Sequence, residues 1–334
     1  MLLPRVFSVS LRHVRELPNK NNLTVKGITM DTQNILVEPT IVAPTIHSSA
    51  VLAEFSVSVW SGRKKDKRAS AQVTMHNNAR SGTANVHKKL LGDCAELKAV
   101  TDFVAKVRLH HYALTMPWAD LGQRLVPTAM LMDYTEQMSS YEQEFHRLVQ
   151  EFLDVYEWEI VQARARLGSL FDNADYTSTD DLRHKFAYKV AITPVPSSGD
   201  FRVDLGNEVN TMLQTSFQEH YQEQLTKAMS DVYNRTRIYL ERLYRSLDYN
   251  EGERRPKLVE STFDGVLDMI ELLGICNLTG DVQMEAIRAK LENQFRGVGK
   301  MPLSSEALRH SSHVRAETKA VVKDVIKTLP TIDL

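Results

Sequence analysis

Cysteine is scarce in this 334-residue sequence, which contains only Cys94 and Cys276. Two distant thiols cannot build a disulfide framework or a four-ligand zinc site, so we expect a reducing compartment. Long hydrophobic runs are also lacking, because no stretch reaches the roughly 18 uncharged apolar residues of a membrane helix. The apolar start of the chain is interrupted by Arg5 and has no small-residue cleavage site after it. The sequence therefore predicts a cytoplasmic protein with no membrane segment.

An excess of charge of one sign is missing as well. The 41 basic residues are balanced by 42 acidic ones, and the net charge is -1. No global field therefore marks the chain as a nucleic-acid or membrane-surface protein, and any such binding must be local. The hydrophobic content of 43% is ample for a buried core in two domains or in one extended helical body.

Motifs of catalysis and metal binding are absent from the sequence. It has no Gly-x-Ser-x-Gly elbow, and the nearest phosphate-loop pattern, at 297–300, follows a helical segment and lacks a Ser or Thr after the lysine. His110 and His111 are adjacent on a predicted helix and point in different directions. His310 and His313 could share a helix face, but no third ligand lies nearby. We predict no catalytic residue, no metal site and no cofactor.

Residues 1–85 are poor in helical periodicity and rich in Val, Ile, Thr, Ser and Pro. The clearest strand is 52–60, where Phe55, Val57 and Val59 alternate with polar residues. This region is predicted to be a small mixed β element with loops.

Two long helices dominate the prediction for residues 86–249. A shorter helix over 86–114 comes first, and Pro117 ends it. The first long helix covers about 128–167 and stops at Gly168. Its apolar side chains are spaced alternately three and four apart, which is a heptad seam that needs a partner helix. The seam consists of Leu131, Tyr134, Met138, Tyr141, Phe145, Leu148, Phe152 and Val155.

A structured connector at 168–206 separates the long helices, and its segments 187–190 and 201–205 are expected to pair as strands. The second long helix follows with Asn207 as its N-cap and runs to about 249. It carries a similar seam, so the two helices fold most simply into a long antiparallel coiled-coil hairpin. The second seam consists of Leu225, Met229, Val232, Thr236, Tyr239 and Leu243.

Residues 250–334 are predicted to form a C-terminal helical cluster. Its helices are expected at 257–274, 281–296 and 304–328. The predicted fold is thus mainly α, with three regions: a mixed strand and loop region at 1–85, a helical body at 86–249, and the cluster at 250–334.

A basic run directly after the predicted strand is the first candidate binding surface. Its cations could hold phosphate groups by charge, and the neighbouring tryptophan could stack on a base. The alternative is a solvated turn whose cations repel one another into water. The candidate residues are Trp60, Arg63, Lys64, Lys65, Lys67 and Arg68.

Two further segments are candidate partner surfaces. The turn at 117–124 either anchors on the core or presents a binding surface, and its Asp120 and Arg124 are placed to form an ion pair. The charges at 199–204 either cap the following helix or present a strand edge to a partner. The residues are Trp118, Asp120 and Arg124 in the first segment, and Asp200, Arg202 and Asp204 in the second.

Four motifs in combination carry a family resemblance. They are Trp60-Ser-Gly-Arg-Lys-Lys, Thr115-Met-Pro-Trp-Ala-Asp-Leu-Gly-Gln-Arg-Leu, Ala165-Arg-Leu-Gly-Ser-Leu-Phe and Gly199-Asp-Phe-Arg-Val-Asp. Over about residues 50–330 the chain resembles domain of unknown function 3150, a family of bacteriophages and mobile elements. The resemblance implies a phage-encoded viral protein with two neighbours, a MoxR-type AAA ATPase and a cobaltochelatase-like von Willebrand A protein. It implies no catalytic residues.

These observations lead to a first hypothesis and an alternative. The first is a non-enzymatic adaptor or assembly protein in the host cytoplasm, which partners the AAA ATPase and the von Willebrand A protein and forms homo-oligomers. The alternative is a nucleic-acid-binding protein that uses the basic run after Trp60. An enzyme has the least support, because no nucleophile, base and orienting group can be assembled from the sequence.

Overall fold

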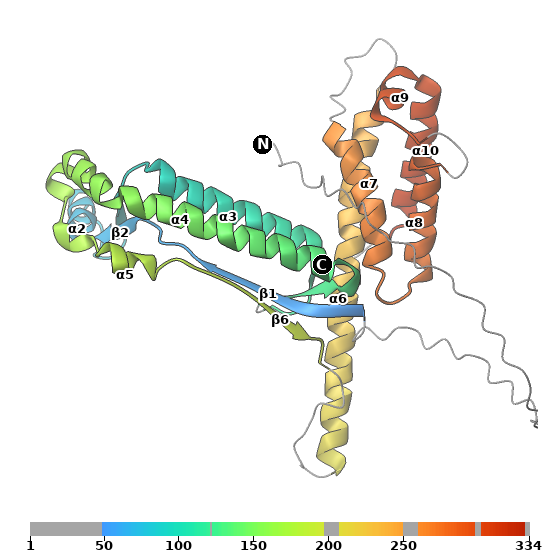
Figure 1. Cartoon of the computed structure of the whole chain (residues 1–334), viewed down its shortest axis with the longest axis horizontal. Helices are drawn as coiled ribbons and strands as arrows, with labels where there is room; N and C mark the ends of the chain where they lie inside the picture. Colours follow the sequence, from blue (N-terminus) through green and yellow to red (C-terminus); the bar gives the residue numbers. More distant parts are fainter. Residues whose placement is uncertain (1–48, 121, 197–206, 250–259, 298–301, 331–334) are drawn as a thin grey trace, which may run out of the picture. The chain divides into compact units, whose positions relative to one another are not determined.

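The computed structural model describes residues 49–120, 122–196, 207–249, 260–297 and 302–330. Contacts divide the chain into two compact units. We call residues 47–233 the N-terminal unit and the part from residue 234 onward the C-terminal unit. The described residues are mainly helical, as predicted, and the small antiparallel sheets lie in the N-terminal unit (Figure 1). None of the described helices offers an apolar stretch long enough to cross a bilayer.

A four-stranded antiparallel sheet forms one layer of the N-terminal unit. Its strand order is β4–β5–β1–β6. The strands are β1 (Ala50–Ser58), β4 (Met116–Pro117), β5 (Gln123–Pro127) and β6 (Ala187–Pro194). Leu52 of β1 lies opposite Leu125 of β5, and Val57 lies opposite Tyr188 of β6. The strand predicted at 52–60 is confirmed, with both ends two residues earlier.

The segment 187–190, which was predicted to pair with 201–205, has another partner. Strand β6 contains the first segment, but it pairs with β1 across a long sequence separation. The second segment lies outside the described residues. Pairing with β1 lets buried Tyr188 pack against Phe55, with ring centroids 5.1 Å apart. This burial against the core, together with the ladder to β1, favours the long-range pairing.

Helices α3 (Ala95–Leu114) and α4 (Leu131–Leu167) pack side by side in antiparallel directions (Figure 1). At one end, Arg166 of α4 donates to the carbonyl of Leu91 just before α3. At the other end, His111 Nδ1 lies 2.9 Å from the hydroxyl of Tyr134. The two helices share one hydrophobic core with the sheet.

The predicted coiled-coil hairpin of the two long helices is therefore wrong in its pairing. All eight seam positions of α4 are buried or half-buried, but all except Val155 belong to the core that α4 shares with α3 and the sheet. Phe145 and Phe152 are fully buried, and Phe145 contacts Tyr188 of the sheet. Burying each such ring stabilises the fold by about 1.5–3 kcal/mol. A heptad seam records that one face is buried, and a sheet can bury that face as well as a helix can.

The helix predicted over 86–114 is wrong at its start. Strand β3 (Val86–Lys89) occupies the first four positions, and α3 begins only at Ala95. Gly92 separates them with φ +64°, a left-handed conformation that ends a continuous helix. Leu90 and Leu91, which were assigned to the helix, are buried in the core as part of this connection.

The connector after α4 holds short elements. These are η2 (Gly168–Leu170), η3 (Asn173–Asp175) and α5 (Thr179–Arg183). Ser178 caps α5 by accepting a hydrogen bond from the amide of Asp181. Tyr176, directly after η3, donates its hydroxyl to the carbonyl of Leu90 at 2.9 Å. This hydrogen bond ties the connector to the segment before α3.

Helix α6 (Asn207–Leu247) matches the second predicted long helix, and the boundary between the two units falls within it. The C-terminal unit adds α7 (Glu260–Ile275), α8 (Val282–Phe295), α9 (Ser305–His310) and α10 (Ser312–Thr328). The predicted C-terminal helices are confirmed, except that a break at Ser311 divides the last one. Asp281, Ser304 and Ser311 cap α8, α9 and α10.

Candidate nucleic-acid interface

The basic run forms a strand and the start of a helix. One of the two predictions for this segment was a solvated turn. Strand β2 (Arg63–Asp66) leads directly into α2 (Lys67–His76), and β3 then pairs antiparallel with β2. We call the two strands together the basic ribbon. The ribbon continues one step beyond the strands, because the amide of Leu90 donates to the carbonyl of Gly62 at 2.8 Å. Gly62 has φ +62°, and a Cβ there would lie 2.9 Å from Leu97.

Basic residues lie opposite basic residues along the ribbon. Arg63 pairs with Lys89, Lys64 with Lys88, and Lys65 with His87. Directly opposed side chains in an antiparallel pair have Cβ atoms about 4.5–5.5 Å apart, and like charges at that distance destabilise the pairing. The ribbon therefore needs counter-charges, and its two faces differ in whether they have them.

One face of the ribbon is neutralised within the fold. Lys64 lies 2.9 Å from Asp175 of η3, and Lys88 forms ion pairs with Asp175 and Asp66. Lys88 also donates to the carbonyl of Leu170, at 2.8 Å. The side chains of Lys88 and Asp175 are each only 8% exposed. This nearly buried network fixes the ribbon to the end of α4 and the connector.

The pKa values follow from these contacts. Burial raises the pKa of Asp175, but the hydrogen bonds and charges of Lys88 and Lys64 outweigh it, so the pKa lies below its usual value. Burial lowers the pKa of Lys88, but Asp175 and Asp66 outweigh burial and raise it. The hydrogen bond from the Ala69 amide is the main reason that the pKa of Asp66 is low. Asp175, Asp66 and Lys88 are therefore charged near neutral pH.

The other face of the ribbon is exposed. Because side chains alternate along a strand, Arg63 and Lys65 of β2 share this face with His87 and Lys89 of β3. All four residues are exposed. Lys89 pairs with Asp93, at 3.1 Å, but within the described ranges no acidic side chain meets the other three. Positive charge on this face is thus left largely uncompensated.

Helix α2 extends the exposed cationic surface. Asp66 caps it by accepting from the amide of Ala69, at 2.9 Å. Ser70 is buried and accepts from the amide of Val86, which holds the helix on β3. Lys67 and Arg68 in the first turn are exposed, next to the positive end of the helix dipole. No acidic partner of these two side chains occurs in the described part of the chain.

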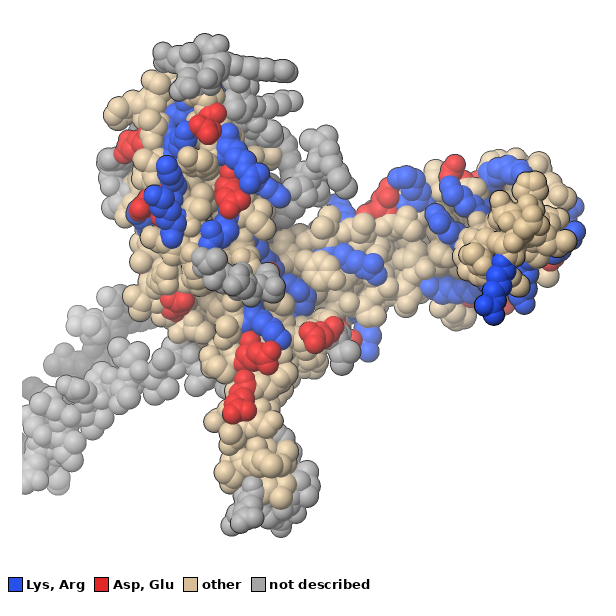
Figure 2. Space-filling model, turned by 180° about the vertical axis from the view of Figure 1, so that it is seen from behind, with Lys and Arg blue, Asp and Glu red and all other residues tan. Residues whose placement is uncertain are grey.

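The surrounding sequence reinforces this charge. Between residues 60 and 92 there are eight Lys or Arg residues and a single acidic residue, Asp66. Lys and Arg side chains gather at the corresponding end of the N-terminal unit in Figure 2. The contribution of β3 was missed at the sequence level, although the polar loop before it and the run Val-His-Lys-Lys, with its β-branched first residue, were available as signals.

Trp60, which precedes the basic run, is half-buried. Its ring lies 6.1 Å from that of Phe152 and 5.9 Å from that of Tyr156, in an edge-on arrangement with the latter. The side chain packs against the main hydrophobic core. The described contacts of the ring are with the core, so the stacking role of Trp60 stays a prediction, and the cations are the exposed part of the run.

The second candidate, the turn at 117–124, is anchored on the fold. Trp118 is 8% exposed and meets the ring of Tyr221 edge-on, with centroids 5.2 Å apart. The Arg124 guanidinium donates to the side chain and carbonyl oxygens of Thr115 and lies 4.9 Å from the centre of the Tyr112 ring. Asp120 is exposed. The geometry supports the structural interpretation of Trp118 and Arg124.

The third candidate set, Asp200, Arg202 and Asp204, lies outside the described residues. The phosphate-loop pattern at 297–300 is described only at Gly297. His111 is buried, and its ring nitrogen lies within hydrogen-bonding distance of the Tyr134 hydroxyl. Within the described ranges, no group of three His, Cys, Asp or Glu side chains is placed to hold a metal ion.

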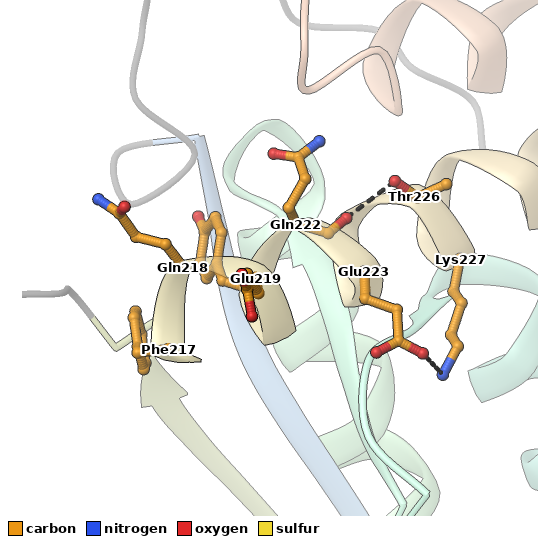
Figure 3. Close-up of a pocket in the computed structure, with 8 residues that line it drawn as sticks. Phe217, Gln218, Glu219, Gln222, Glu223, Thr226 and Lys227 are labelled. Atoms are coloured by element: carbon orange, nitrogen blue, oxygen red, sulfur yellow. Dashed lines mark hydrogen bonds and ion pairs between the residues drawn. The ribbon is translucent and has the colours of Figure 1, made fainter. Parts of the chain in front are cut away.

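A hollow of about 880 Å³ lies along the middle of α6. Figure 3 shows Glu223 and Lys227 joined across one helical turn, at 2.9 Å, while Gln222 points to the other side. Its described lining comes from consecutive turns of this one helix. Such a lining presents an ion pair and amides, and it brings together no nucleophile with a base.

Comparisons with known proteins give one finding. Residues 48–244 match the family DUF3150, described as a protein of unknown function. No curated protein and no solved structure shows significant similarity to the chain. The matched segment contains the whole N-terminal unit described above, including the basic ribbon, and most of α6. Since it covers more than half of the sequence, the chain belongs to the DUF3150 family.

Proposed function

We propose that the protein binds nucleic acid through the exposed face of the basic ribbon and the first turn of α2. One observation carries the proposal: cations on the inner face are paired with Asp175 and Asp66, whereas among the described residues only Lys89 of the outer face has an acidic partner. The fold pairs the lysines of the inner face with carboxylates. It leaves most of the positive charge on the outer face uncompensated by the described residues, so this charge is available to a ligand.

A polyanion is the ligand that suits this surface. Phosphate groups would supply counter-charge to Arg63 and Lys65, for which the described part of the chain offers no acidic partner. Arg and Lys side chains are the main donors to phosphate oxygens in nucleic-acid complexes. The Asp175 network holds the ribbon in place before binding, so little ordering cost remains.

The test is binding of a fluorescent oligonucleotide to the full chain at low salt, with a variant in which the four unpaired cations Arg63, Lys65, Lys67 and Arg68 are replaced by Gln. We expect binding at about 50 mM salt that weakens about 100-fold or more by about 200 mM, because about four phosphate contacts release counterions. The variant should lose this binding. Absence of binding by the unaltered chain at low salt would contradict the proposal.

We propose as a second candidate the adaptor role beside a MoxR-type AAA ATPase and a von Willebrand A protein. The observation that favours a protein partner is an exposed apolar pair on α4: Trp158 is 61% exposed and Val161 is 66% exposed. Residues three apart on a helix form one patch, and exposed aromatic side chains are enriched at protein interfaces. Membership of the family supports the resemblance from which these partners come.

The adaptor candidate is tested by co-purification and by native mass. The tagged chain should retain one of these partners or form a homo-oligomer after nuclease treatment, and the double variant Trp158→Ala, Val161→Ser should lose it. Val282→Ser is the matched control, because Val282 is 83% exposed on α8 of the C-terminal unit. A monomer that retains neither partner would rule this candidate out.

A further inference from the structure

The chemistry of the ribbon also indicates which form of nucleic acid it takes. Residues 61–92, which include both strands and α2, contain no Phe, Tyr or Trp. Trp60 is the aromatic residue nearest in the sequence, and its ring packs against Phe152 and Tyr156. Proteins that bind single strands use aromatic side chains as stacking platforms, at about 1–3 kcal/mol per base. The basic ribbon offers no such platform, so a single strand would gain only its phosphate contacts.

The density of charge favours a duplex over a single strand. A DNA duplex carries one charge per about 1.7 Å of axis, against about 3.4 Å for each strand alone. Arg63 and Lys65 are two residues apart on one strand face, about 7 Å along the strand, with Lys89 and His87 opposite them. This compact cluster can meet several phosphates of a duplex at once.

The shape of the ribbon agrees with a groove in the duplex. Each strand has four residues, which corresponds to about 13 Å of length, and the strands are about 4.8 Å apart. The major groove of B-form DNA is about 12 Å wide and admits a two-stranded ribbon. The corresponding groove of duplex RNA is deep and narrow, and side chains cannot enter it.

The rigidity of the ribbon fits the same ligand. Lys64 and Lys88 are held by Asp175, and Ser70 joins α2 to Val86. A cationic face held in place in this way matches the regular phosphate rows of a duplex better than the variable backbone of a single strand. The exposed cations at Lys67 and Arg68 lie beside the ribbon and extend the surface toward phosphates that flank the groove.

We infer that the basic ribbon binds B-form duplex DNA at the major groove through phosphate contacts; this inference rests on the proposed nucleic-acid function. Recognition is independent of sequence, since Arg and Lys contacts to phosphates carry no base information. The ligand class is thus double-stranded DNA of any sequence.

The experiment compares three labelled probes of equal length, about two helical turns each, on the full chain: duplex DNA, its single strand, and duplex RNA. Binding is measured by anisotropy at about 50 mM salt, with the four-Gln variant of Arg63, Lys65, Lys67 and Arg68 as the site control. We expect duplex DNA to bind at least about tenfold more tightly than either other probe, unlabelled DNA of another sequence to compete equally, and the variant to lose all binding.

The possible failures are distinguishable. Equal or tighter binding of the single strand or of duplex RNA, still lost in the variant, would overturn the duplex DNA inference and leave the nucleic-acid function standing. No binding of any probe would overturn both. Binding that persists in the variant would also overturn both, because the ribbon would then not be the site.

Discussion

The basic ribbon and the C-terminal unit differ in how the charges of their Lys and Arg side chains are compensated. In the C-terminal unit, Arg288 lies 2.6 Å from Glu285 and 2.5 Å from Glu292. Arg296 lies 2.5 Å from Glu271, and Lys290 pairs with an aspartate of α10. On the outer face of the ribbon, basic residues instead lie opposite basic residues, and within the described part of the chain only Lys89 of this face has an ion-pair partner.

This difference separates charge that serves the fold from charge that is available to a ligand. The paired cations of the C-terminal unit link α7 to α8 and α8 to α10, and each pair satisfies its own electrostatics. The ribbon keeps repulsive pairs that a purely structural surface would avoid. A count of basic residues does not distinguish the two regions, whereas the position of their acidic partners does.

The largest expected effect is on the pH dependence of stability. It should differ between the two units because each has a buried titratable group of a different kind. Burial, followed by the nearby charges of Arg124 and His110, lowers the pKa of His111 from 6.5 to about 4. The unfolded chain therefore binds a proton below pH 6.5 that the folded N-terminal unit refuses until about pH 4. The free energy of unfolding should therefore decrease as the pH falls from 6.5 to about 4, by about 3 kcal/mol in total.

The three tryptophans all lie in residues 47–233, so their fluorescence in urea titrations at pH 7 and pH 5 reports on the N-terminal unit. His111→Gln should flatten this dependence. In the C-terminal unit, burial, Glu271 and Asp264 raise the pKa of Asp268 from 3.8 to about 6. Its stability should therefore rise as the pH falls from 6 toward 3.8. Equal acid responses of both units would break the comparison.

Removal of two cations should affect binding in one region only. Arg63→Ala with Lys65→Ala should weaken binding of duplex DNA roughly 30-fold at low salt, since two phosphate contacts are lost. The matched control, Arg245→Ala with Lys290→Ala, removes the same charge from paired positions of the C-terminal unit. Anisotropy titrations should find its affinity unchanged. Equal losses in both variants would mean that net charge, and not the ribbon, controls binding.

Asp175→Asn tests whether the inner face holds the ribbon. The change leaves Lys88, at 8% exposure, without its closest counter-charge, and should cost on the order of 1–3 kcal/mol in stability. The pKa of Asp175 lies below 3.8, so its stabilising effect is present at neutral pH and is lost as the pH falls through that lower value. Hydrogen exchange of the β2 and β3 amides should accelerate.

The control for this change is Asp324→Asn, which removes the partner of the half-exposed Lys290. Exposed pairs contribute little to stability, so its effect should be much smaller. Protection of the ribbon amides that is unchanged in Asp175→Asn would show that the network does not position the strands.

The smallest effect is expected in the C-terminal unit from Gly265→Ala. An added Cβ would lie 2.9 Å from the ring of Tyr239, so either the ring or α7 must shift. This strain opposes the helix-forming gain of alanine, and we expect a net loss on the order of 1 kcal/mol, measured by thermal unfolding. Gly274→Ala in the same helix meets only the flexible Arg288 side chain, and should be neutral or stabilising. Neither change should alter DNA binding.

Long periodic segments could be predicted from the sequence, and long-range partners could not. The patterns over 128–167 and 207–249 located α4 and α6 within a few residues, because caps and periodicity are local signals. The seam of α4 indicated burial correctly, but the same pattern serves a coiled coil and a helix packed on another helix and a sheet. Its real partners, α3 and β6, are separated from it in the sequence.

The candidate site was predictable only in part for the same reason. The cations of 63–68 were evident as a basic run, but their division into a paired and an unpaired row depends on the pairing of β2 with β3. Asp175 lies more than a hundred residues away, and its acidic segment gave no sign that it would neutralise Lys64 and Lys88. Trp60 looked available beside the cations because its packing against α4 leaves no local sequence pattern.

The salt dependence of duplex DNA binding tests the central claim most directly. For the unaltered chain, a plot of log affinity against log salt concentration should have a slope of about -3.6, which corresponds to four phosphate contacts. The variant Arg63→Ala, Lys65→Ala should have a slope shallower by about two, since each lost contact removes about one. An unchanged slope in the variant, or no binding by the unaltered chain at low salt, would contradict the assignment of the ribbon as the nucleic-acid site.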